Sequence, residues 1–173
     1  MSNPRDLFLQ LLGEMLWTER TLAFEALPEL RCDVTAEGLA QAVDEHLEQT
    51  KEHAARLEQV FRAAGAEPSS NLSPPAEKLA EHRKQFAANV PEDRLKDVLN
   101  AAAAAATEHL EIAMYDALVE LAGALDLGDA RGLLEENRKE EEEALRRVED
   151  ELGKLVQAAA TARATAGSTG PGA

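Results

Sequence analysis

Five ionisable side chains occupy positions where the helical periodicity of the sequence calls for apolar residues. They are four carboxylates and one imidazole: Glu19, His53, Glu108, Glu111 and Glu141. A carboxylate buried without a partner is costly, and it either meets a cation or takes up a proton. Carboxylates with a few imidazoles suit iron or manganese better than structural zinc, which favours thiolates. The pattern therefore indicates a metal site inside a helical protein.

Glu19 is the only charged residue in an apolar stripe of the first predicted helix. The stripe steps alternately by four and three residues, as one face of a helix does. Two interpretations stay open: Glu19 is buried and meets a partner, or the stripe is slightly rotated and Glu19 lies at its solvated rim. The stripe consists of Phe8, Leu12, Met15, Glu19, Leu22 and Ala26.

Glu108 and Glu111 lie three residues apart on one predicted helix face, between Ala104 and Tyr115. Two carboxylates on one buried face repel each other unless a cation lies between them. The alternative is that both lean outward and that the Ala-rich face alone forms the core. Apolar residues on both sides of the pair favour the buried interpretation.

His53 and Glu141 are weaker candidates when each is considered alone. A single histidine on an apolar face, such as His53, is more often a satisfied core residue than a ligand. Glu141 belongs to the acidic run 140–143, which a solvated helix face would explain. Taken together, however, each long predicted helix places an acidic or imidazole group toward the interior. Two-metal carboxylate sites in four-helix bundles are built from such groups.

Apolar periodicity predicts the elements that must position these residues. Thr35 is predicted to cap the second helix, Gly65 to end it, and Pro91 to occupy the first turn of the third long helix. Pro28 and the segment through Asp33 are predicted to interrupt the first helix. The expected long helices span 6–27, 36–64, 91–125 and 129–160, and a shorter one spans 76–88.

The connections between these helices predict the fold class. Short links join the first helix to the second and the third to the fourth, so each pair forms an antiparallel hairpin. The segment 65–91 is long enough to cross the bundle. We therefore expect an all-α, ferritin-like four-helix bundle, with one short additional helix in the crossover between helices two and three. The bundle is expected to span 1–160, and the Ala-, Thr- and Gly-rich tail 161–173 is expected to be disordered.

Composition narrows the classes of function. The 173 residues include 33 acidic and 18 basic side chains, for a formal charge of −15, and only 3% are aromatic. Few aromatics argue against an all-β fold, and the acidic balance argues against nucleic acid and against anionic membrane surfaces. No basic and apolar leader and no long apolar run is evident, so a cytoplasmic location is expected. Cys32, the single cysteine, cannot form an intramolecular disulfide.

Four segments, in order along the chain, resemble one known family. The segment Glu108-His-Leu-Glu-Ile-Ala-Met-Tyr115 resembles the third-helix signature of the YciE/YciF-like ferritin-like proteins, with Leu110 at the usually aromatic third position. Together the four segments cover residues 5–155, and their order makes the resemblance specific. The other three are Asp6-Leu-Phe with Thr18-Glu-Arg-Thr-Leu22, the stretch from His46 to Phe61, and Leu133-Leu-Glu-Glu136 with the acidic run after it.

That family is in turn similar to rubrerythrin, whose di-iron ligands follow Glu, Glu-x-x-His, Glu-x-x-Glu and Glu-x-x-His over four helices. By this resemblance, the five candidate residues match ligand positions. Thr50 stands where the second helix should offer its Glu, and Ala144 stands where the fourth should offer its His. Gln49, His46 or Glu140 could compensate for these two departures.

The resemblance implies a stress-related role and a homodimer formed through helix faces, with the short helix at the interface. A complete di-iron or di-manganese site would support an oxidase or peroxide-scavenging activity. The two departures leave a second hypothesis, a non-enzymatic dimeric stress or interaction protein that has lost the metal chemistry. A ferritin-like storage cage is less expected, because the sequence identifies no assembly surfaces. Tyr115 is either a hydrogen-bond donor to a ligand or a core residue.

Overall fold

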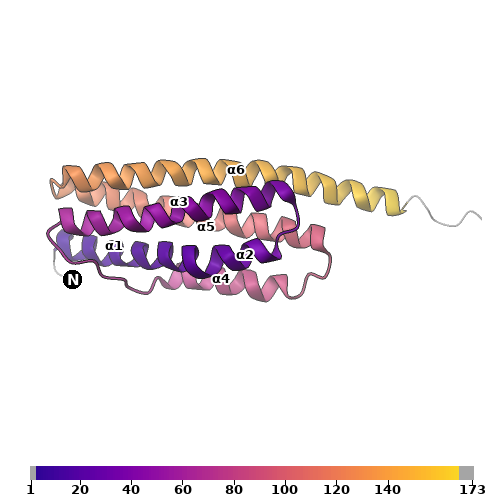
Figure 1. Ribbon diagram of the computed structural model, residues 1–173, viewed down its shortest axis with the longest axis horizontal. Helices are drawn as coiled ribbons and strands as arrows, with labels where there is room; N and C mark the ends of the chain where they lie inside the picture. The colour runs from indigo at the N-terminus through magenta and orange to yellow at the C-terminus, as the bar shows by residue number, and fades with distance from the viewer. Residues whose placement is uncertain (1–2, 168–173) are drawn as a thin grey trace, which may run out of the picture.

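The computed structural model describes the backbone of residues 3–167, and within this range every regular element is helical. Figure 1 shows α1, α3, α5 and α6 running lengthwise beside one another, with α4 along the outside near α2. The expected all-α bundle with a short crossover helix is confirmed. The elements are α1 (Pro4–Thr21), a π-helical turn η1 (Leu22–Ala26), α2 (Leu27–Asp33), α3 (Glu37–Ala63), α4 (Pro74–Ala87), α5 (Asp93–Ala124) and α6 (Gly128–Gly167).

The sequence predicted that Pro28 would interrupt the first helix, but the helix does not stop there. It continues to Asp33 through the wider turn η1, in which the N–H of Leu27 donates to the carbonyl of Leu22, five residues earlier. A proline inside a helix lacks an N–H and clashes with the carbonyl four residues before it. A π-helical turn just ahead of the proline rearranges those hydrogen bonds, so the chain stays helical.

The start of α3 also differs from the prediction. Thr35 does not cap the helix with its side chain; α3 begins at Glu37, and Ala36 flanks it. The buried carboxylate of Asp97 in α5 accepts from the N–H of Thr35 at 2.9 Å and from the N–H of Ala36 at 3.0 Å. It also accepts from the Thr35 hydroxyl at 2.6 Å. An acid from another helix therefore binds this positively polarised helix end.

Among the other predicted helix boundaries, the one at Gly65 is confirmed and two differ. Gly65 adopts a left-handed φ of +69° after α3, as expected of a residue that ends a helix. Pro91 lies before α5 rather than in its first turn. Helix α6 continues past the expected end at residue 160 to Gly167, so the first part of the tail predicted to be disordered is helical. The rest of that tail lies outside the described residues.

The interior has three zones along the bundle axis. One apolar cluster contains Phe8, Leu57 and Leu118, and another contains Leu30, Leu39 and Val148. On each long helix the candidate ligand residues fall between the segments that supply these two clusters. Within the described part of the chain, no helix has the length and apolarity needed to cross a membrane. The zone between the clusters is the candidate site.

Candidate metal centre

The structure brings the five predicted side chains together in the middle of the bundle and adds a sixth, His46. Helix α1 supplies Glu19, α3 supplies the two histidines, α5 supplies Glu108 and Glu111, and α6 supplies Glu141. All six are buried, and none exposes more than 4% of its surface. The rim position considered for Glu19 and the outward lean considered for the α5 pair are therefore wrong.

The six residues form two adjacent groups. The His46 group consists of His46, Glu108, Glu111 and Glu141, and the His53 group consists of Glu19, His53 and Glu141. Within each group, one nitrogen or carboxylate oxygen of every residue lies within 4.8 Å of the others. Glu141 belongs to both groups, so its carboxylate lies where it could bridge two ions.

In the His53 group, the two ring nitrogens of His53 face different carboxylates. Nδ1 lies 2.7 Å from Oε1 of Glu141 and 3.4 Å from Oε1 of Glu19. Nε2 lies 2.8 Å from Oε2 of Glu140, and Arg56 holds that carboxylate at 2.7 Å. A hydrogen bond from one ring nitrogen to a carboxylate orients the other nitrogen as a metal ligand. Here Glu140 accepts from Nε2, and Nδ1 faces the candidate site.

Further hydrogen bonds surround the His53 group. The buried hydroxyl of Tyr115 donates to Oε1 of Glu19. The side chain of Asn137 donates to the Tyr115 hydroxyl oxygen at 2.9 Å and accepts from Arg56 at 2.9 Å. Tyr115 thus donates to a residue predicted to be a ligand and also packs in the apolar cluster of Phe8. Asn137 was not predicted; it lies four residues before Glu141, on the same face of α6.

The His46 group has far fewer partners. Nε2 of His46 lies 3.3 Å from Oε1 of Glu108 and 3.7 Å from Oε2 of Glu141. Among the described residues, neither oxygen of Glu111 has a hydrogen-bond partner, and the same is true of Oε2 of Glu108. Buried polar atoms without partners are rare, and each calls for an explanation. A cation bound between these carboxylates would satisfy them.

Burial strongly perturbs the carboxyl groups. It raises the pKa values of Glu108 and Glu111 well above their ordinary value, and the neighbouring charge of Glu141 adds to the effect. Burial also raises the pKa of Glu141 itself. The protonated forms of Glu108 and Glu111 are therefore favoured when no cation is present, and metal binding would have to release those protons.

The two histidines are shifted in opposite directions. Burial lowers the pKa of His46 and leaves its ring neutral, the form that binds metals. Burial also acts to lower the pKa of His53. The charge of Glu19 and a hydrogen bond to Glu141 outweigh it and raise that pKa to about 11. Without metal, His53 is thus a buried cation that balances its acidic neighbours.

The two departures from the rubrerythrin pattern are both buried inside the bundle. The hydroxyl of Thr50 donates at 2.8 Å to the carbonyl of His46, in its own helix. Of the three possible substitutes, Gln49 accepts from Arg147 at 2.9 Å, and Glu140 bonds to His53 from outside the two groups. Only His46 joins a group. Its spacing of seven residues, two helical turns, from His53 was the signal available in the sequence.

Solved structures share this fold over most of the chain. The crystal structure of the stress protein YciF from Escherichia coli superposes with a TM-score of 0.85 at 29% identity, covering 91% of this chain and 99% of that one. YcfI from Rhodopseudomonas palustris, described as a candidate structural protein, gives a TM-score of 0.83 at 30% identity, covering 86% of this chain and 94% of that one. A protein from Xanthomonas campestris at 17% identity, with a TM-score of 0.73, shows the fold alone.

Sequence comparison agrees with the structural match. Protein YciF of Escherichia coli (strain K12) is 32% identical over 142 residues, which is 82% of this chain and 85% of that protein. The family model described as a domain of unknown function (DUF892) matches residues 3–161. The chain therefore belongs to this YciF-like family of helical bundles.

Proposed function

We propose that the chain binds a pair of iron or manganese ions in the middle of the bundle. The His46 group would hold one ion, the His53 group the other, and Glu141 would bridge them. One observation carries the proposal: buried carboxyl groups from three helices converge with two imidazoles, and several of their oxygens have no hydrogen-bond partner in the described structure. Such a set is costly to bury unless a cation offsets its charge.

The donor set suits this class of metal. Carboxylate oxygens with imidazole nitrogens are typical ligands of iron and manganese in helical bundles. His46 gives the first group an imidazole, which offsets the histidine that Ala144 does not provide. The hydroxyl of Thr50 donates to a carbonyl of its own helix, so we expect no ligand from that position. The resulting site would be less symmetric than the rubrerythrin pattern.

An incomplete ligand set would leave open coordination positions on the ions. An iron pair with open positions supports oxidation of ferrous iron or reduction of peroxide or dioxygen. We therefore propose an oxidase or peroxide-scavenging activity for the loaded protein. Consumption of peroxide by the iron-loaded chain, compared with the metal-free chain, tests this step separately from metal binding.

Metal content is the decisive measurement. Protein purified without chelator, or loaded with ferrous or manganous ions, should retain roughly two ions per chain. Glu141→Gln and Glu108→Ala should lower the retained metal, whereas Glu143→Gln is the matched control. Glu143 lies on the surface of the same helix and pairs with Lys139 at 3.8 Å. If the wild-type chain retains neither metal after loading, the proposal is wrong.

A second candidate function is a non-enzymatic stress or interaction protein. The buried Thr50 and Ala144 at two ligand positions favour it, as do the descriptions of YciF as a stress protein and of YcfI as a candidate structural protein. In this case the chain would act as a homodimer in the cytoplasm, with α4 at the interface. Phe86 on α4 is 53% exposed and would be covered by such contact.

Sedimentation of the metal-free chain tests the dimer. A dimer that retains no metal would support the second candidate, and Phe86→Glu should then weaken its association. A monomer that binds metal would exclude the second candidate and keep the first.

A further inference from the structure

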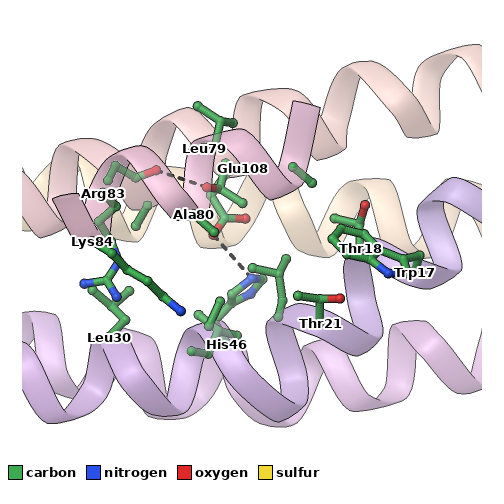
Figure 2. Close-up of a pocket in the computed structure, with 17 residues that line it drawn as sticks. Trp17, Thr18, Thr21, Leu30, His46, Leu79, Ala80, Arg83, Lys84 and Glu108 are labelled. Carbon is green, nitrogen blue, oxygen red and sulfur yellow. Dashed lines mark hydrogen bonds and ion pairs between the residues drawn. The ribbon is translucent and has the colours of Figure 1, made fainter. Parts of the chain in front are cut away.

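A narrow cavity reaches the His46 group from the side of the bundle that α4 covers. It has a volume of about 50 Å³ and lies between α4, the first helix and α5. Figure 2 shows Trp17 and Thr21 on one side of it, Leu30 and Lys84 on the other, and Leu79 above. A single water needs about 10–15 Å³ of such space, so the cavity can take a molecule of a few heavy atoms.

The inner end of the cavity is formed by two residues of the His46 group. His46 and Glu108 line it, and Figure 2 shows the imidazole facing the carboxylate. Glu108 is only 3% exposed, and its Oε2 has no hydrogen-bond partner in the described part of the chain. Neither Glu19 nor His53 lines this cavity. The cavity therefore serves one half of the candidate centre.

The walls select against anions. Most of the lining side chains are apolar, among them Leu79, Ala80 and Ala104. The two lining cations are already paired: Arg83 with Asp33 at 2.9 Å, and Lys84 with Glu29 at 2.6 Å. An anion that entered would lose its hydration and find no unpaired cation on the described walls, which is costly.

We propose that this cavity binds a small uncharged molecule, of the size and polarity of dioxygen or nitric oxide, and delivers it to the His46 group alone. Binding of the delivered molecule to a metal at the inner end of the cavity rests on the proposed function. Occupancy of the cavity does not, because the apolar walls are present without metal.

Xenon, a small apolar atom, tests the cavity in the metal-free chain. Under xenon pressure, the methyl signals of Leu79 and Ala104 in nuclear magnetic resonance spectra should shift and saturate. Ala104→Phe should fill the cavity and abolish the shift, and Ala80→Leu, on α4, gives a second route if the first variant does not fold. Ala102→Leu is the control, because Ala102 is exposed on the same helix and does not line the cavity. If xenon binds elsewhere or not at all, the proposal fails.

Nitric oxide and azide then test delivery in the ferrous-loaded chain. Filling the cavity should slow formation of the ferrous nitrosyl signal by about tenfold without changing the iron content. Azide, a charged probe of similar size, should be slowed much less. An unchanged nitric oxide rate in a variant that has lost xenon binding overturns the proposal, and equal slowing of azide overturns the selection for uncharged molecules. If the chain binds no iron, the proposed function is wrong. The xenon experiment still tests whether the cavity binds a small uncharged molecule.

Discussion

The two halves of the candidate centre are built differently. In the His53 group, Tyr115 donates to Glu19, and Glu140 accepts from His53. In the His46 group, both oxygens of Glu111 lack a hydrogen-bond partner among the described residues, and the group borders a cavity. Oε2 of Glu19 and Oε2 of the shared Glu141 also lack a hydrogen-bond partner among the described residues, so the two halves differ in degree. Side-chain hydrogen bonds organise the His53 group, whereas neither oxygen of Glu111 has one in the described structure.

The two groups tolerate buried ionisable side chains in different ways. Around His53, a buried cation and its carboxylates stabilise each other, so the half can exist without metal. Around Glu111, burial favours the protonated, neutral carboxyl group, and a metal would have to displace that proton. The same substitution should therefore have opposite effects in the two halves.

The largest expected effect comes from replacing one carboxylate in each half with leucine. In metal-free protein, Glu19→Leu should lower the free energy of unfolding by about 3–5 kcal/mol, because it leaves His53 charged and buried without one of its partners. Glu111→Leu should leave the free energy unchanged or raise it by about 1 kcal/mol, because it removes an unsatisfied polar group. Urea unfolding in the presence of chelator measures both.

Each variant is the control for the other, because both remove a fully buried carboxyl group. Equal losses in the two variants would contradict the proposed difference between the halves.

A smaller effect is expected from pH. The metal-free chain should lose stability as pH rises above 6.5, because His53 keeps its proton in the folded state up to a pKa of about 11 but has an ordinary value of 6.5. Glu111 acts in the same direction, since burial raises its pKa well above the ordinary 4.5. Stability from both protons is full below the ordinary values and is lost as pH rises toward the folded ones. Each retained proton contributes about 1.4 kcal/mol per pH unit.

Urea unfolding at several pH values above 6.5 checks this slope. His46 does not contribute there, because burial lowers its pKa and its ring is neutral in both states. Glu111→Leu should make the slope shallower, by at most about one proton or about 1.4 kcal/mol per pH unit. A stability that is flat or rises over this range would show that the buried groups do not retain their protons.

The smallest effect is expected at Thr50, which lies between the two histidines on α3. Thr50→Val keeps the side-chain shape and removes a hydroxyl that bonds to a carbonyl of its own helix. The free energy of unfolding should change by less than about 1 kcal/mol, and the retained metal should not change. Loss of metal in this variant would show that Thr50 is a ligand, which would contradict the ligand sets proposed for the two groups.

Much of the fold could be predicted because helix periodicity is a local property. Apolar spacing located all four long helices, and the same spacing identified Glu19, Glu108 and Glu111 as charges on an interior face. The structure confirms the bundle and buries these residues. Length and the long segment between the second and third long helices were enough to predict the crossover.

Several of the misses depend on residues that are distant in the sequence. The start of α3 is bound by Asp97, which lies in another helix. Pro28 remains inside a helical segment because a wider turn precedes it and the segment packs against α3 and α5. Spacing placed His46 near the predicted ligands, but it could not show which neighbours its ring would meet.

The sequence by itself determined the helices, the buried face of each one and the class of side chain in the middle zone. Only the tertiary structure decided how those side chains divide between two groups, that Glu141 is shared and that His46 joins. The physical reason is that periodicity sets the direction of a side chain relative to its own helix, whereas the packing of helix against helix sets its distance to every other helix.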